Sequence, residues 1–145
     1  LDEAFWQQNE TSAQITSWRG FAFENVCFNH IRQIKAALGI SGVSTTQSAW
    51  SKRASEKDED GAQIDLIISR KDNIVNMCEI KFFSKEFTVE KSYHSTLVER
   101  QSLISSLIPK KSIVHSTLIT TYGLTYNEYS GDFVNTITLS DLFKD

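Results

Sequence analysis

Hydrophobic residues recur along two stretches of this chain with the spacing of helices. Over residues 17–38 the apolar positions are three or four residues apart, and Gly39 follows them. The same spacing returns over residues 89–108, and there Pro109 follows. Such spacing places apolar side chains on one face of a helix, and Gly or Pro commonly stops one. The pattern therefore predicts two long helices.

A hairpin of two buried strands is predicted between these helices. Residues 62–70 are rich in Ile and Leu, and a second apolar run covers residues 74–83. The polar residues 71–73 between the two runs are typical of a turn. Nearly continuous apolar runs are expected where a strand is covered on both faces.

Three further segments have the composition of strands. They cover residues 43–50, 112–122 and 134–139, and a short helix with Ser140 as its cap follows the last of them. The order is helix, strand, hairpin, helix, strand and tail. This order predicts an α/β domain in which a mixed β-sheet is flanked by α-helices.

The size of the chain suits one domain, because 145 residues with 40% hydrophobic content can bury a single core. We assign residues 17–145 to this domain. Residues 1–16 are interpreted as an N-terminal arm or a linker from a preceding domain, and a first residue other than Met suggests a piece of a longer protein. No apolar run approaches the ~18 residues that span a bilayer, so we expect a soluble, cytoplasmic protein with no membrane partner.

Charge and cysteine content narrow the range of functions. The formal net charge of −3 argues against strong autonomous binding to nucleic acid, which depends on Lys and Arg at phosphates. The charged residues 51–60 are expected to form a solvent-facing loop. Cys27 and Cys78 lie in apolar runs without metal-binding spacing, so we expect buried free thiols rather than a disulfide. His30 lies close to an apolar stripe and is expected to be a satisfied core histidine.

The hairpin carries the clearest chemical signal. If its turn is centred on Asp72, then Asp65 and Glu79 each lie seven positions from that centre and are directly opposed. Opposed side chains on one sheet face have Cβ atoms about 4.5–5.5 Å apart, and two carboxylates there repel unless something lies between them. Burial adds a desolvation cost. A bound divalent cation such as Mg²⁺, or Mn²⁺, is the simplest remedy.

Further residues extend this candidate site. Alternation along the strand places Lys81 on the same face as Glu79, whereas Ile80 points to the other face and offers a metal its backbone carbonyl. Glu24 lies about 60° from the centre of the first helix's apolar stripe, a flanking position from which it can reach the sheet edge. These residues together predict a site at one end of the hairpin.

Each candidate residue also has a purely structural explanation. Glu79 and Lys81 could form a simple charge pair, Asp65 could be satisfied by backbone groups or by Lys81, and Glu24 could lie on a solvated helix flank. On the second long helix, two auxiliary candidates fall on or beside the apolar stripe, where they could point into the pocket or cover the core at the helix edge. These two residues are Arg100 and Gln101.

The placement of these residues resembles a known superfamily. Asp65 followed by the residues Glu79-Ile80-Lys81, after a helix that contains Glu24, is similar to the Asp…Glu-x-Lys core of the PD-(D/E)XK nucleases. Three longer segments resemble the C-terminal domain attached to a group of prokaryotic AAA-type ATPases, and the resemblance covers most of residues 18–143. The segments are residues 18–24 (WRGFAFE), 61–66 (GAQIDL) and 120–124 (TTYGL).

The resemblance implies a restriction-endonuclease-like fold, with Mg²⁺ or Mn²⁺ bound by Asp65, Glu79, Ile80 and Glu24 and with Lys81 assisting at the nucleophile or transition state. It also implies DNA as the substrate and an AAA-type ATPase domain N-terminal to this chain in its parent protein. The chain itself has no Walker-type phosphate-binding loop. The residues before Asp65 depart from the superfamily's name pattern, which has a proline there.

Three functions are compatible with the sequence. The first is a metal-dependent endo- or exodeoxyribonuclease. The second is a catalytically inactive nuclease-fold module with a regulatory, nucleic-acid-binding or protein-docking role, which the acidic net charge favours. The third is a unit for oligomerisation or docking that uses Phe5 and Trp6, and the sequence allows an oligomer.

Overall fold

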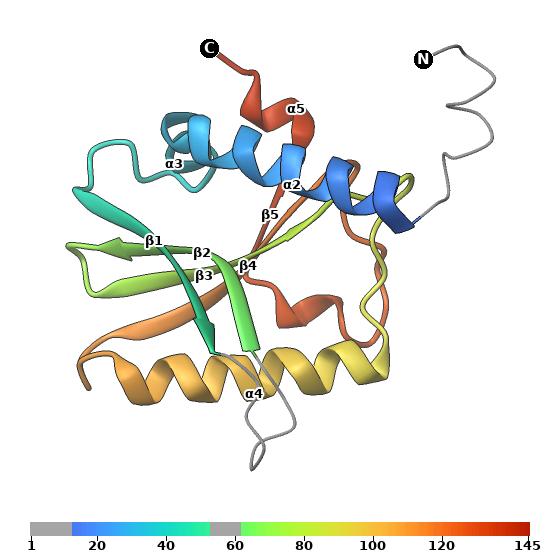
Figure 1. The fold of residues 1–145 in the computed structure, drawn as a ribbon. Helices are drawn as coiled ribbons and strands as arrows, with labels where there is room; N and C mark the ends of the chain where they lie inside the picture. Colours follow the sequence, from blue (N-terminus) through green and yellow to red (C-terminus); the bar gives the residue numbers. More distant parts are fainter. Residues whose placement is uncertain (1–12, 53–61) are drawn as a thin grey trace, which may run out of the picture.

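A central sheet with helices on both faces organises the computed structural model, which describes residues 13–52 and 62–145 (Figure 1). The helices α2, α3 and α5 lie on one face of the sheet, and α4 lies on the other. The expected α/β architecture is therefore confirmed. The elements are α2 (Ala13–Asn29), α3 (Ile31–Ala37), β1 (Thr45–Lys52), β2 (Ala62–Arg70), β3 (Ile74–Lys81), α4 (Lys91–Leu107), β4 (Ile113–Thr120), the 3-10 turn η1 (Ser130–Asp132), β5 (Asn135–Thr138) and α5 (Leu139–Leu142).

Within the described ranges, five strands form one mixed sheet in the order β1-β2-β3-β4-β5. β2 pairs antiparallel with both β1 and β3, whereas β3, β4 and β5 run parallel to one another. Parallel neighbours need a crossover, and α4 supplies it between β3 and β4. The carboxyl ends of β3, β4 and β5 consequently lie at the same edge of the sheet.

Burial on both faces explains the apolar runs of β2 and β3. On the α4 side, Met77 and Val75 of β3 pack with Ile104 of the helix. On the opposite side a larger cluster joins the sheet to α2, α3 and α5, and full burial of each Leu or Ile there contributes about 1.5–3 kcal/mol. That cluster comprises Phe23, Cys27, Ile34, Leu66, Ile68, Cys78, Ile80, Ile119, Ile137 and Leu142.

The cysteine prediction is confirmed, because Cys27 and Cys78 are both buried and free. Burial, with a smaller contribution from the nearby carboxylates of Glu24 and Asp65, raises the pKa of the Cys27 thiol to about 12. Burial likewise raises the pKa of Cys78. Both thiols therefore stay protonated and apolar at neutral pH, as core residues require.

The helix predicted over residues 17–38 is two helices rather than one. His30 separates α2 from α3 with φ −126° and ψ 34°, and its N–H donates to the carbonyl of Cys27 three residues back. The His30 ring lies with Nδ1 2.6 Å from the carbonyl oxygen of Val26, so the side chain satisfies the end of α2. The sequence has no Gly or Pro at this break, and the apolar spacing continues through it, so a single helix was predicted. The expectation of a satisfied histidine is confirmed, although the residue is half-buried.

The strand limits differ from the prediction by a few residues. The β2 strand matches residues 62–70, but β3 ends at Lys81, and Phe82 and Phe83 lie beyond it. The cap of α5 is Thr138 rather than Ser140, because Thr138 N–H donates to the Asp141 carboxylate at 2.9 Å. Of the arm predicted at residues 1–16, residues 13–16 belong to α2, which begins four residues earlier than predicted, and residues 1–12 lie outside the described residues. Of the loop predicted at residues 51–60, residues 51 and 52 belong to β1, and the rest lies outside the described residues.

Asp141 gives the fold a pH-dependent contribution. Its pKa is lowered from 3.8 chiefly by the hydrogen bond from Thr138 N–H and by Lys144, 2.9 Å away. A lowered pKa stabilises the fold above the unfolded-state pKa, and that contribution is lost as pH falls through the folded-state value. Asp141→Ala should therefore cost about 1 kcal/mol or less at pH 7. Urea unfolding at pH 7 and pH 2.5 tests this, and an equal loss at both values would contradict it.

Among the described residues, no helix combines the length and apolar character needed to cross a membrane.

Candidate functional site

The register of the β2–β3 hairpin agrees with the predicted one. Leu66 pairs with Cys78, and Ser69 pairs with Val75, so each pair is centred on residue 72 as the sequence suggested. Asn73 closes the turn with φ 67°, a left-handed conformation that asparagine tolerates. The regular pairing ends at Leu66 and Cys78. Asp65 and Glu79, the next residues, therefore lie where β2 and β3 are no longer regularly paired.

A bulge in β2 lies at this point. Ser48 of β1 pairs with Ile67 and Trp50 pairs with Ile64, so two steps along β1 oppose three steps along β2. An extra residue of this kind bends a strand and redirects its side chains. It explains how Ile64 and Ile67 both pack on the α4 side, although their spacing would place them on opposite faces of a regular strand. Asp65 lies inside this irregular segment.

Asp65 lies in the gap between the two strands. Its Oδ2 accepts a hydrogen bond from the backbone N–H of Ile80 at 2.9 Å, and its Oδ1 accepts one from the Gln63 side chain at 3.1 Å. The carboxylate thus takes the place that a backbone carbonyl occupies in a regular ladder. The sequence predicted the opposition of the two strands but not this role, because bulges have no reliable signal in the apolar pattern.

Glu79 is fully buried, and α4 supplies its partners. Oε1 accepts a hydrogen bond from the Tyr93 hydroxyl at 3.1 Å and forms an ion pair with the guanidinium of Arg100. Oε2 is buried and has no hydrogen-bond partner within the described part of the chain. Burial raises the pKa of Glu79, the Arg100 guanidinium acts against this, and the carboxylate of Asp65 raises the pKa further.

Lys81 lies on the same side of β3 as Glu79, as the alternation predicted. Its Nζ stands 5.0 Å from the centre of the Tyr93 ring. An ammonium group over an aromatic face is held by the ring quadrupole, with about 0.5–1 kcal/mol at exposed sites and more when desolvated. Tyr93 therefore contacts both charged residues of the Glu-x-Lys segment.

Glu24 approaches the same end of the sheet from α2. It is half-buried, and burial raises its pKa, the carboxylate of Asp65 raises it further, and the ammonium of Lys81 lowers it. Asp65 and Lys81 act in the same way on Glu79. Asp65 and Lys81 are thus close enough to both Glu24 and Glu79 to shift the pKa of each.

The two auxiliary candidates behave differently. Arg100 reaches Glu79, whereas Gln101 is exposed on α4. Of the two alternatives left open for this pair, an inward position therefore holds for Arg100 and not for Gln101. Successive residues on a helix are 100° apart, and only Arg100 shares the face of Tyr93, seven positions earlier. The sequence pattern counted Tyr93 as part of the apolar stripe and missed its hydroxyl.

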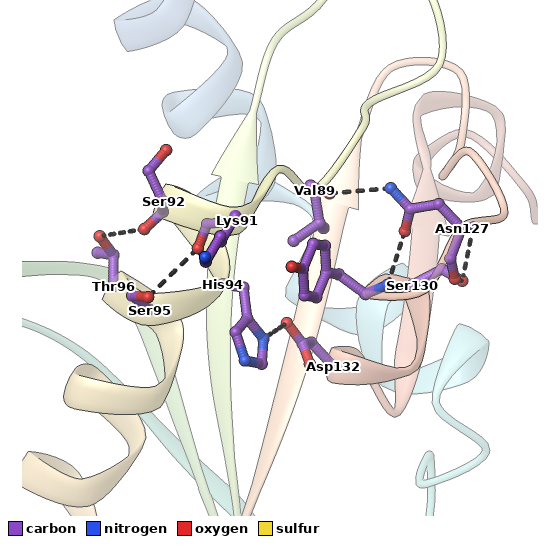
Figure 2. A network of polar contacts seen from close by, with 10 residues as sticks. Val89, Lys91, Ser92, His94, Ser95, Thr96, Asn127, Ser130 and Asp132 are labelled. Carbon is purple, nitrogen blue, oxygen red and sulfur yellow. Dashed lines mark hydrogen bonds and ion pairs between the residues drawn. The ribbon is translucent and has the colours of Figure 1, made fainter.

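A second polar network holds the start of α4 (Figure 2). His94 Nδ1 lies 2.6 Å from Asp132 Oδ2 of η1, and the His94 ring stacks on Tyr129 with centroids 4.8 Å apart. The Asn127 side chain donates to the carbonyl of Val89 at 2.9 Å, just before the helix. No role was predicted for His94, because its partner is 38 residues away. This network fixes the helical turn that carries Tyr93.

The carboxylates of Asp65 and Glu79 have features that suit the binding of a hard cation. Among the described residues, no three His, Cys, Asp or Glu side chains form a ready-made metal cluster. Mg²⁺, however, commonly takes only one or two protein carboxylates and fills its shell with water and substrate oxygens. Oε2 of Glu79 is a buried acceptor with no donor in the described part of the chain, and an unsatisfied buried acceptor destabilises a fold. Asp65 and Glu79, with the Ile80 carbonyl between the strands, are the residues that would hold the ion.

The repulsion that motivated a metal is, however, already reduced by the protein. The guanidinium of Arg100 neutralises Glu79, while Asp65 is stabilised by hydrogen bonds from Ile80 and Gln63. A cation is therefore not required to keep the two carboxylates in place. The partners found are Arg100 for Glu79, and Ile80 N–H and Gln63 for Asp65, so the structural explanation of Asp65 as a carboxylate held by backbone groups stays open beside the metal site.

Comparison with known proteins leaves the family open. No protein-family model matches the chain, and no curated protein matches it. The crystal structure of a protein of unknown function, AF1548, is similar with a TM-score of 0.46 and 14% sequence identity. The similarity covers 81% of this chain and 64% of that one, so this chain spans less than two thirds of the length of AF1548.

Proposed function

We propose that this chain is a metal-dependent phosphodiester-hydrolysing domain of the PD-(D/E)XK type that acts on DNA. The observation that supports this most is the gathering of Glu24, Asp65, Glu79 and Lys81 at one end of β2 and β3. Asp65 and Lys81 each affect the pKa of both Glu24 and Glu79, and one buried oxygen of Glu79 has no hydrogen-bond donor among the described residues. We further propose that an AAA-type ATPase precedes this domain in the parent protein, which rests on the sequence resemblance alone.

Each side chain has a role in this proposal. Asp65 and Glu79 hold Mg²⁺ or Mn²⁺, which when bound supplies Lewis-acid assistance to phosphodiester hydrolysis. Lys81 stabilises the negative charge that develops on the phosphate in the transition state. Glu24 orients a water molecule from the α2 side. Arg100 keeps Oε1 of Glu79 fixed, so that Oε2 remains free for the cation.

Metal titration beside a cleavage assay tests the proposal. Calorimetry with Mg²⁺ and with Mn²⁺ should show binding by the purified chain, and plasmid DNA should be cleaved only when metal is added. Asp65→Ala should lower metal affinity by at least about tenfold, because it removes a carboxylate ligand. Glu99→Gln, which changes an exposed carboxylate on α4, is the matched control and should behave as the wild type. Absence of metal binding by the wild-type chain would refute the site.

The ion pair between Glu79 and Arg100 favours a second candidate function. A carboxylate that is already neutralised has less to gain from a cation, as in a nuclease fold that has lost activity and serves as a regulatory or docking module. The same assay separates the two candidates. Metal binding without cleavage of plasmid or single-stranded DNA would support the inactive module.

A further inference from the structure

We infer that Tyr93 is a positioning residue that holds both Glu79 and Lys81 of the proposed site, an inference that rests on the proposed function. Its hydroxyl donates to Oε1 of Glu79 at 3.1 Å, and its ring lies 5.0 Å from Nζ of Lys81. One side chain on α4 therefore fixes the carboxylate and the ammonium that alternate along β3. Neither the motif nor the comparisons assign any role to this tyrosine.

The ring of Tyr93 is itself held in place. It meets the ring of Phe87 edge to face, with centroids 5.4 Å apart, and Phe87 meets Phe83 in the same way at 6.0 Å. The ring also packs against the buried cluster that contains Val89 and Leu97. A rigid support matters because a site residue displaced by about 1 Å can lose about a hundredfold in rate.

The two contacts use different parts of the side chain, so they can be separated. The hydroxyl donates to Oε1 of Glu79 and so limits rotation of the carboxylate, whereas Oε2 takes no part in this hydrogen bond. The ring face holds the Lys81 ammonium by a cation–π contact. This contact leaves the positive charge in place, whereas an ion pair with a second carboxylate would neutralise it. Tyr93→Phe removes only the first contact, whereas Tyr93→Leu removes both. Tyr122→Phe is the matched control, because Tyr122 is 62% exposed.

The contacts can be measured in metal-free protein. After reductive ¹³C-dimethylation of lysines, the Lys81 methyl signal, assigned by its absence in Lys81→Met, should be shifted upfield by the ring current. We expect this shift to persist in Tyr93→Phe and to disappear in Tyr93→Leu. A urea double-mutant cycle of Tyr93→Phe with Glu79→Gln should show a non-additive change in the unfolding midpoint. An unshifted Lys81 signal in the wild type would overturn the contact between Lys81 and the Tyr93 ring. Additive changes in the unfolding midpoint would overturn the hydrogen bond between the Tyr93 hydroxyl and Glu79.

Mg²⁺ calorimetry then tests positioning. Partners of metal ligands typically contribute about 10–100-fold to affinity or activity, so Tyr93→Phe should weaken Mg²⁺ binding about tenfold, and Tyr122→Phe should not. If the wild type binds Mg²⁺ and Tyr93→Phe binds and cleaves equally well, the positioning role is wrong while the proposed function stands. If the wild type binds no Mg²⁺, the proposed function is wrong and the positioning role falls with it, whatever the metal-free contacts show.

Discussion

Arg100→Leu should destabilise the fold by about 3–5 kcal/mol, because it leaves the fully buried Glu79 carboxylate without its cationic partner. A buried ion pair adds little stability over an apolar pair, yet removing one member strands a charge whose desolvation is no longer offset. The loss should appear as a lower urea midpoint at neutral pH. The exposed neighbour provides the control, since Gln101→Leu should leave the midpoint nearly unchanged.

A second change should recover much of this loss. Glu79→Gln in the Arg100→Leu background replaces the stranded charge with a neutral amide of the same shape, so the double variant should be more stable than Arg100→Leu alone. Under the proposed function, millimolar Mg²⁺ should also stabilise Arg100→Leu more than the wild type, because the cation takes over part of the guanidinium's role. If Arg100→Leu unfolds at the wild-type urea concentration, the ion pair does not hold Glu79 as the structure indicates.

The main elements of the fold were predictable because their signals are local. The apolar period predicted α4. The composition of residues 62–70, with the turn after them, predicted β2 and the register of the hairpin. The break at His30 was not predictable in this way. It depends on a ring that binds the carbonyl of Val26 and packs on Phe143, 113 positions further along the chain. Long-range contacts of this kind override local periodicity.

The candidate site was predictable only as far as strand alternation and register extend. Strand alternation placed Glu79 and Lys81 on one face of β3, and the hairpin register placed Asp65 opposite Glu79. The bulge that turns Asp65 toward the N–H of Ile80 depends on how β1 pairs with β2, which a single strand's pattern does not encode. Arg100 was named as an auxiliary candidate, but its pairing with Glu79 was not foreseen, and Tyr93 was counted only as an apolar residue. Both lie on the core-facing stripe of α4, and the apolar period indicates that a side chain is buried but not what its polar end contacts.

Under the proposed function, Lys81→Met should reduce the rate of metal-dependent DNA cleavage by about 10²–10³-fold, the usual effect of removing one group that stabilises transition-state charge. In that proposal the ammonium acts on the phosphate and not on the cation, so the affinity for Mg²⁺ should change little while the maximal cleavage rate falls. Single-turnover cleavage at saturating Mg²⁺ measures the rate, and calorimetry measures the affinity. Lys81→Arg should retain part of the rate because it keeps the charge, although the geometry of the fork differs.

Lys85→Met provides the matched control, because Lys85 is an exposed lysine four residues further along the chain. It should cleave at the wild-type rate, which separates a specific effect of Lys81 from a general loss of positive charge toward DNA. A parallel loss of cleavage in both variants would assign Lys81 to electrostatic attraction of the substrate, which salt weakens. An unchanged rate in Lys81→Met would remove it from the chemistry altogether. Its contact with Tyr93 would then stabilise the end of β3 and serve no reaction, as expected of a nuclease fold used for docking.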